Sequence, residues 1–396
     1  DERWQRIVGK APVRAFQKIV QMAIDKRVHA VLITGDVYTS ADHNLTAQLD
    51  YVRLLHKLAQ NNIQVFAVLG NHDPLEAWKA KIPFPPNVHV FPTDAVERVP
   101  LVVDGEEVAA IYGQSYAKSE QRDNLAWKFN RAAGDRFSIG MLHTQVGSRD
   151  STYAPCTLED LKECGMDYWA LGHIHKHEIL CEKPYVVYAG NPQGLDCTET
   201  GPRGCYYVEV GPYGTTDLEF IDTSIVRWES IDLAIDGIES VSELRESVRF
   251  AKEKVRRDIG KPTFLTVNFT GSGSMYHVLN NPEATQYWLE SWREEEQGKY
   301  AFVMVERLRN LARPKMNMDE RSKLPDSVGD YLNVFDKLEK LAPEERAKAL
   351  RDILMSRPEF ERLGAYGRAL TDQRLLETFE KAKWLGVQKL LEHRRG

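Results

Sequence analysis

Short runs of apolar residues, many of them β-branched, punctuate the first 225 residues of the chain. Runs of this kind are typical of strands that are buried on both faces. They predict strands at 28–34, 63–69, 137–142, 167–171, 185–190 and 205–210. Residues 12–26 and 44–60 instead carry apolar positions three and four apart, which predicts amphipathic helices. Helices that alternate with buried strands predict an α/β fold.

The pattern changes after residue 225. Residues 226–271 read as strand, helix and strand, which predicts a small α+β domain. Beyond Pro314 and Pro325 the apolar spacing is helical almost to the end of the chain. Residues 312–326 separate the two patterns and are expected to form a linker.

Composition narrows the class of protein. The 396 residues contain no apolar run long enough for a membrane-spanning helix, so no membrane partner is expected. Because the net charge is −6, a nucleic-acid partner would have to be bound through local basic patches or metal ions. The five cysteines include no C-x-x-C pair, which favours free thiols and a reducing, cytoplasmic compartment over a zinc site or a disulfide framework.

Polar residues follow the predicted strands where the apolar runs stop. Ligands of open α/β sheets bind at the carboxyl ends of the strands, so we expect these side chains to lie close together. They are Asp36, Asn71, His72, Asp73, His143, His173 and His175. His177 continues the alternation of His173 and His175, which would place three rings on one side of an extended segment.

Each of these groups has a second interpretation when it is taken alone. Gly35-Asp36 is compatible with a simple turn. His143 is compatible with a hydrogen-bonded core histidine, and the alternating histidines are compatible with a polar surface loop. Their joint occurrence, each at the end of an apolar run, favours a site with chemistry.

The residue types indicate divalent metal ions. Carboxylate, amide and imidazole groups are ligands of hard and borderline divalent ions. One aspartate can bridge two ions, and Asp73 is expected to orient the His72 ring and raise its basicity. Two ions about 3.5–4 Å apart stabilise both the attacking and the leaving oxygen of phosphoryl transfer. The residue types therefore fit two-ion phosphoryl chemistry.

The ordered segments GDVY (35–38), GNHD (70–73), LHTQ (142–145) and GHIH (172–175) resemble the motifs of calcineurin-like metallophosphoesterases. YAGNPQG (188–194) and ETGPRGC (199–205) resemble more narrowly the SbcD-like DNA repair exonuclease subunits. The resemblance implies a four-layer α/β/β/α sandwich with a small α+β capping domain and a C-terminal helical region. The expected bounds are 1–223 for the nuclease core, 224–312 for the capping domain and 325–396 for a helical region that docks a partner.

The resemblance also implies roles for the strand-end residues. Asp36 would bridge two Mn²⁺ ions, with Mg²⁺ as an alternative, and Asn71, His143 and His173 would complete the shell of one ion. His175 would bind the other ion. His72, supported by Asp73, would be the catalytic histidine, whereas His177 has no counterpart and is expected to be a loop histidine.

The function that follows from the resemblance is a Mn²⁺-dependent DNA nuclease, acting as exonuclease or endonuclease in DNA repair or in degradation of foreign DNA. The implied partners are DNA, an SMC-like (SbcC-like) ATPase and a second copy of the chain in a homodimer. Two rival functions stay open. One is a phosphoesterase for small nucleotides or phosphoproteins, and the other is a non-catalytic scaffold subunit that tethers DNA.

Two features depart from the family. Its first motif, Asp-x-His on an N-terminal strand, is absent, and we expect it upstream of Asp1 because a core without that strand would have an exposed sheet edge. Thr39 stands where relatives often have Asp or His, and threonine is a poor metal ligand. His43 lies nearby and is an alternative for that position.

Two further segments have a functional and a structural interpretation. The basic run KEKVRR (252–257) is expected to be a solvated helix face rather than a phosphate-binding patch. The apolar stripes of the tail include Tyr331, Phe335, Phe379 and Leu385. They would either dock a partner helix or pack within the chain.

Overall fold

The computed structural model describes residues 2–38, 45–76, 82–148, 150–316, 318–361 and 370–392. The chain forms two compact units. The first unit comprises 1–231, 250–267 and 289–307, and the second comprises 232–249, 268–288 and 308–396. Thr39 and His43 lie outside the described residues. Among the described helices, no helix combines the length and apolarity that crossing a bilayer needs.

The first unit contains two sheets built largely from parallel strands. The smaller sheet has the order β1-β2-β3, with β1 at Ala30–Ile33, β2 at Gln64–Ala67 and β3 at Val88–Val90. The larger sheet has the order β4-β5-β6-β7-β9-β8. Its strands are β4 (Glu97–Val103), β5 (Glu106–Gln114), β6 (Ser138–His143), β7 (Tyr168–Gly172), β8 (Glu178–Glu182) and β9 (Tyr185–Tyr188). All predicted strands of this region are present.

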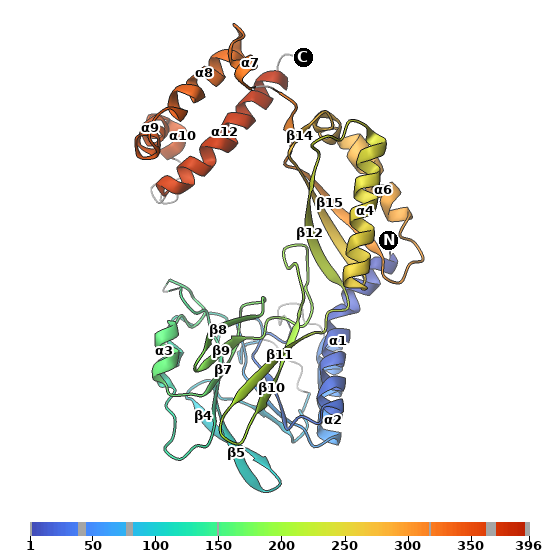
Figure 1. Cartoon of the computed structure of the whole chain (residues 1–396). Helices are drawn as coiled ribbons and strands as arrows, with labels where there is room; N and C mark the ends of the chain where they lie inside the picture. Colours follow the sequence, from blue (N-terminus) through green and yellow to red (C-terminus); the bar gives the residue numbers. More distant parts are fainter. Residues whose placement is uncertain are drawn as a thin grey trace. The chain divides into compact units, whose positions relative to one another are not determined.

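Helices and a hairpin complete the first unit. α1 (Glu2–Asp25) and α2 (Leu45–Gln60) lie side by side (Figure 1). The other elements are a 3₁₀ helix, η2 (Leu125–Lys128), α3 (Leu158–Glu163), and the antiparallel pair β10 (Gly204–Val210) and β11 (Thr216–Asp222). The first helix begins ten residues earlier than the predicted 12–26 and contains Pro12.

Alternate strand residues divide the interior into layers. In β7, Ala170 faces the core between the two sheets together with Phe66 of β2. Its neighbour Trp169 points to the opposite face and packs with Leu161 of α3. On the outer face of the smaller sheet, α1 and α2 pack onto β1 and β2, and Leu55 is fully buried there. Because side chains of a strand alternate between faces, this pattern gives helix, sheet, sheet and helix layers and confirms the expected fold class.

The next elements match the predicted strand, helix and strand. β12 (Arg227–Ala234), β13 (Thr263–Thr270) and β15 (Val303–Asn310) form a sheet in that order. The helices of this region are α4 (Val241–Ile259), α5 (Tyr276–Leu279) and α6 (Pro282–Glu294). Two short strands, β14 (Ser272–Gly273) and β16 (Arg313–Pro314), pair in parallel.

Helices make up the remainder of the second unit. They are α7 (Met318–Ser322), α8 (Ser327–Glu339), α9 (Pro343–Met355), α10 (Pro358–Glu361) and α12 (Asp372–Glu392). The expected linker 312–326 therefore contains α7. The rings of Phe335 and Phe379 lie 4.7 Å apart, so apolar residues of α8 and α12 pack on each other. Leu385 of the same stripe is 53% exposed, and partner docking by the tail stays a prediction.

Candidate metal centre

Four predicted ligands meet where strands of the two sheets end. Asp36, His143 and His173 each offer a ligand atom within 4.8 Å of the others. The Oδ1 atom of Asn71 lies 2.9 Å from His143 Nε2 and 3.1 Å from His173 Nδ1. We call Asp36, Asn71, His143 and His173 the strand-end cluster. Their metal-binding roles stay predictions, but the structure brings their donor atoms together.

The atoms of the strand-end cluster face each other mainly as electron-pair donors. His143 Nδ1 lies 2.8 Å from the Thr34 carbonyl, which can only accept a hydrogen bond, so Nδ1 carries the proton. In the neutral ring, Nε2 then directs a lone pair toward Asn71 Oδ1 and toward Asp36 Oδ2 at 3.3 Å. The lone pairs of His143, Asn71 and Asp36 therefore converge with the His173 ring beside them, and such a donor set fits a divalent cation.

The protonation states of this cluster also suit a cation. Burial lowers the pKa of His173 to about 4, so this ring is neutral near pH 7 and can act as a ligand. Burial acts to raise the pKa of Asp36. The neighbouring His143 and the hydrogen bond from the His72 amide outweigh that effect and hold the pKa below its ordinary value. Asp36 is therefore ionised.

Glycines make the close approach of these groups possible. A Cβ atom on Gly70 would lie 2.3 Å from Asp36 Oδ1, and one on Gly172 would lie 2.8 Å from His143 Nδ1. Gly35 has a φ of +94°, and its Cβ would lie 2.7 Å from the same nitrogen. The recurrence of glycine directly before Asp36, Asn71 and His173 was the sequence signal for this packing.

Asp73 joins the loops that carry Asp36 and Asn71. Its buried carboxylate accepts hydrogen bonds from the backbone amides of Asp36 (3.1 Å), Val37 (3.0 Å) and Gly70 (2.7 Å). Burial raises the pKa of Asp73. These partners are amides and not the His72 ring, so the expected orientation of that ring by Asp73 stays a prediction.

His72 lies next to the cluster without being part of it. Its backbone amide donates to Asp36 Oδ1 at 2.8 Å, while the residue itself is exposed. An exposed imidazole beside this partly buried cluster is accessible to a substrate that approaches from solvent.

The side chains of His173, His175 and His177 lie in three different environments. His173 belongs to the strand-end cluster, whereas the exposed His175 pairs through Nδ1 with the carboxylate of Glu199. That hydrogen bond is the largest cause of a raised pKa of His175. His177 stacks on Phe220 with ring centroids 3.7 Å apart, so it packs on the β10–β11 hairpin. Sequence reasoning missed Glu199, although it lies in the ETGPRGC segment.

The described residues supply unequal donor sets for two ions. The strand-end cluster provides four donors for one ion. For a second ion, Asp36 and His175 are the predicted ligands among the described residues. The structure therefore groups donors for one ion, whereas His175 lies outside that group and stays a predicted ligand of a second ion.

A second buried polar cluster involves the basic run 252–257. Glu296 accepts hydrogen bonds from Lys252 (3.0 Å), Arg256 (2.8 Å), Lys299 (3.1 Å) and the Val303 amide (2.8 Å). We call Lys252, Arg256, Glu296 and Lys299 the ion-pair cluster. Burial acts to raise the pKa of Glu296, but the Val303 amide, Arg256 and Lys252 outweigh it and lower the pKa to about 2. The expectation of a wholly solvated basic face was wrong for Lys252, which is 2% exposed.

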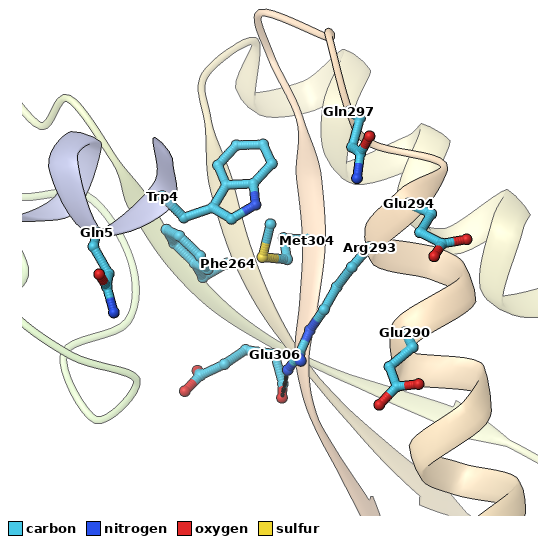
Figure 2. A pocket seen from close by; sticks show the side chains of 9 residues that line it. All are labelled: Trp4, Gln5, Phe264, Glu290, Arg293, Glu294, Gln297, Met304 and Glu306. Atoms are coloured by element: carbon cyan, nitrogen blue, oxygen red, sulfur yellow. Dashed lines mark hydrogen bonds between the residues drawn. The ribbon is translucent and has the colours of Figure 1, made fainter. Parts of the chain in front are cut away.

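A cavity of about 600 Å³ lies beside α1, α6 and β15. Figure 2 shows Trp4, Phe264 and Met304 gathered on one side of it, and Glu290 on α6 on the other. Arg293 reaches into the cavity and donates to the Glu306 carbonyl at 3.3 Å. This lining combines apolar surface with a guanidinium and the glutamates Glu290, Glu294 and Glu306. It contains none of the polar residues predicted at the strand ends, so we place the candidate site at the strand ends.

Comparison with known proteins identifies the family of the chain. Residues 9–177 match the calcineurin-like phosphoesterase family, and residues 228–313 match the middle domain of the metallophosphoesterase YhaO. The uncharacterized metallophosphoesterase YhaO of Bacillus subtilis (strain 168) is 32% identical over 315 residues, which are 78% of this chain and 76% of the relative. The DNA double-strand break repair protein Mre11 of Sulfolobus acidocaldarius is 21% identical over 368 residues, 87% of this chain and 88% of that protein. Since one relative at this identity spans most of both chains and the family's motifs meet at one cluster, the chain belongs to the calcineurin-like metallophosphoesterases.

Proposed function

We propose that the chain is a Mn²⁺-dependent DNA nuclease of the SbcD-like kind. The observation that carries the proposal is the convergence of Asp36, Asn71, His143 and His173, with the exposed His72 beside them. The relatives named DNA double-strand break repair protein Mre11 support DNA as the substrate. The proposal includes Mn²⁺ as the resident ion, with Mg²⁺ as the alternative.

The strand-end cluster would hold one ion, and Asp36 with His175 would contribute to the second. Divalent ions in such a site acidify water and neutralise charge on a phosphate. His72 would donate a hydrogen bond or a proton to an oxygen of the scissile phosphate, since its ring is exposed next to the cluster. Asp73 would hold the loops of Asp36 and Gly70 in register through their amides.

The proposal extends to organisation and partners. Residues 1–223 would form the nuclease core, 224–312 the capping domain and 325–396 the region that docks an SMC-like ATPase. Val334 and Leu385, each about half exposed on α8 and α12, are apolar positions available for such docking. The chain would act in the cytoplasm as a homodimer. Its nuclease activity would serve DNA repair or the degradation of foreign DNA.

The test is a Mn²⁺ titration of cleavage of end-labelled duplex and single-stranded DNA. Loss of a general acid or base lowers a rate by about 10²–10⁴-fold, so we expect a drop of that size in His72→Ala with Mn²⁺ binding retained. Asp36→Ala should lose both cleavage and Mn²⁺ binding. His56→Ala, which removes an exposed histidine on α2, is the matched control and should cleave as the unchanged chain does.

Three results would contradict the proposal. Unchanged cleavage in His72→Ala would remove that residue from the reaction. Hydrolysis of a chromogenic phosphodiester that DNA does not inhibit would favour a small-molecule substrate. Absence of both Mn²⁺ binding and cleavage would favour the scaffold function.

A further inference from the structure

The ETGPRGC segment (199–205) contributes no residue to the strand-end cluster. Its side chains Glu199 and Arg203 instead contact His175. Both carboxylate oxygens of Glu199 are engaged. Oε1 pairs with His175 Nδ1, and Oε2 accepts from Asn191 Nδ2 at 2.8 Å and from the Leu195 amide at 2.7 Å. The Glu199 side chain is only 14% exposed, while His175 is 45% exposed. The carboxylate is therefore a fixed group that faces a ring open to solvent.

The backbone of His175 is held by the same segment and its neighbour. The His175 carbonyl oxygen accepts a hydrogen bond from the Arg203 guanidinium and another, at 3.0 Å, from the backbone amide of Asn191. Gly190 packs so closely that a Cβ there would lie 2.7 Å from this carbonyl oxygen. With the backbone and one ring nitrogen both fixed, the imidazole has little freedom to rotate.

The hydrogen bond to Glu199 decides which nitrogen of His175 is free. A carboxylate accepts hydrogen bonds, so His175 Nδ1 carries the proton and Nε2 keeps the lone pair of the neutral ring. His143 shows the same arrangement, because the Thr34 carbonyl holds its Nδ1 and leaves Nε2 to face the strand-end cluster. Carboxylates that orient metal-bound histidines in this way strengthen metal binding.

We infer that Glu199 is a positioning residue that holds His175 in the Nδ1-protonated tautomer, so that Nε2 can bind the second divalent ion. The inference rests on the proposed function, because it assumes a two-ion site. It makes a specific claim: Glu199 acts on the ion bound by His175 and leaves the ion of the strand-end cluster unaffected.

The test compares the unchanged chain with Glu199→Gln by equilibrium titration with Mn²⁺ alone. Glutamine keeps an oxygen for the Leu195 amide but removes the carboxylate that selects the tautomer. Loss of such an orienting partner costs about 10–100-fold in metal affinity, so we expect the weaker Mn²⁺ site to lose affinity by that factor. The tighter site should be unchanged, which also reports that the variant is folded.

A second measurement separates orientation of the ring from general support of the loop. Nitrogen-15 NMR of labelled histidines in metal-free protein reports which ring nitrogen is protonated. The His175 proton should lie on Nδ1 in the unchanged chain and should move toward Nε2 in Glu199→Gln. Glu182→Gln removes the charge of an exposed glutamate on β8 and should alter neither readout.

The outcomes distinguish the inference from the proposed function. If Glu199→Gln binds Mn²⁺ at both sites as tightly as the unchanged chain does, the inference is overturned. It is also overturned if the His175 proton stays on Nδ1 in that variant. Either result leaves the nuclease proposal standing. Loss of both sites in Glu199→Gln would assign Glu199 to the fold rather than to His175, which also overturns the inference. If the unchanged chain binds no Mn²⁺, the proposed function fails and the inference fails with it.

Discussion

The first unit contains two buried polar clusters that differ in their balance of donors and acceptors. In the ion-pair cluster, the Glu296 carboxylate is surrounded by two lysines, an arginine and a backbone amide. In the strand-end cluster, Asp36, Asn71 and ring nitrogens of His143 and His173 lie mostly against one another. Buried polar groups need partners. The first cluster finds its partners within the chain, whereas the second leaves acceptors that a cation would satisfy. The difference identifies which cluster is structural and which is a candidate active site.

Removal of the Glu296 carboxylate from the ion-pair cluster should destabilise the folded chain. In Glu296→Ala, Lys252 is left buried without its main ionic partner, and breaking a buried pair costs about 3–5 kcal/mol. Urea unfolding of Glu296→Ala should therefore give a free energy of unfolding that is lower by that amount than in the unchanged chain. Mn²⁺ binding should be unchanged, and a loss of Mn²⁺ binding would mean that the two clusters are not independent.

Acid should weaken the ion-pair cluster in a defined pH window. The pKa of Glu296 is lowered from 4.5 to about 2 in the folded chain, so its contribution is complete above about pH 4.5 and is lost as pH falls toward 2. The shift corresponds to about 3 kcal/mol. The stability difference between the unchanged chain and Glu296→Gln should be constant from pH 5 to 7, within about 0.5 kcal/mol, and shrink at lower pH. A constant difference down to pH 3 would contradict the lowered pKa.

Addition of Mn²⁺ should stabilise the strand-end cluster. Binding at one site with free Mn²⁺ at about 100 times Kd adds about 2.7 kcal/mol to the free energy of unfolding. Thermal unfolding with and without Mn²⁺ measures this increment. It should be the same in Glu296→Ala and absent in Asp36→Ala, and an equal increment in Asp36→Ala would place the bound ion elsewhere.

The smallest effect is expected at the rim of the ion-pair cluster. Lys299 pairs with Glu296 but its side chain is 42% exposed, and partly exposed pairs contribute about 0.2–1 kcal/mol. Lys299→Ala should lower the free energy of unfolding by no more than that amount. A loss as large as in Glu296→Ala would show that Lys299, rather than Lys252, neutralises the carboxylate.

The layers of the core could be predicted from sequence because they depend on local patterns. Continuous apolar runs located β1, β2, β6, β7, β9 and β10. The strands β3, β4, β5, β8 and β11 were not predicted. In the edge strands β4 and β8, exposed residues interrupt the apolar positions. The start of α1 was missed as well. Its first turns pack Trp4 and Ala11 against Trp228 and Phe264, contacts that depend on tertiary structure.

The candidate site also contains residues that could be predicted from the sequence and residues that could not. Asp36, Asn71, His143 and His173 could be expected together because each stands at the carboxyl end of a buried strand, although these strands belong to two different sheets. Glu199 could not, since its contact with His175 depends on the path of the loop between β9 and β10. The partners of Asp73 are backbone amides, and no pattern of side chains predicts those. Local rules thus found the candidate ligands but not the groups that hold them in place.

The bonds of Asp73 have a consequence for the opening motions of the protein. A single carboxylate holds the amides of Asp36, Val37 and Gly70, which belong to loops after different strands. Opening of either loop breaks bonds to the same group, so these amides should exchange their hydrogens with solvent as one cooperative unit. The exchange rate of three backbone hydrogens would then report how often the site comes apart, without any substrate present.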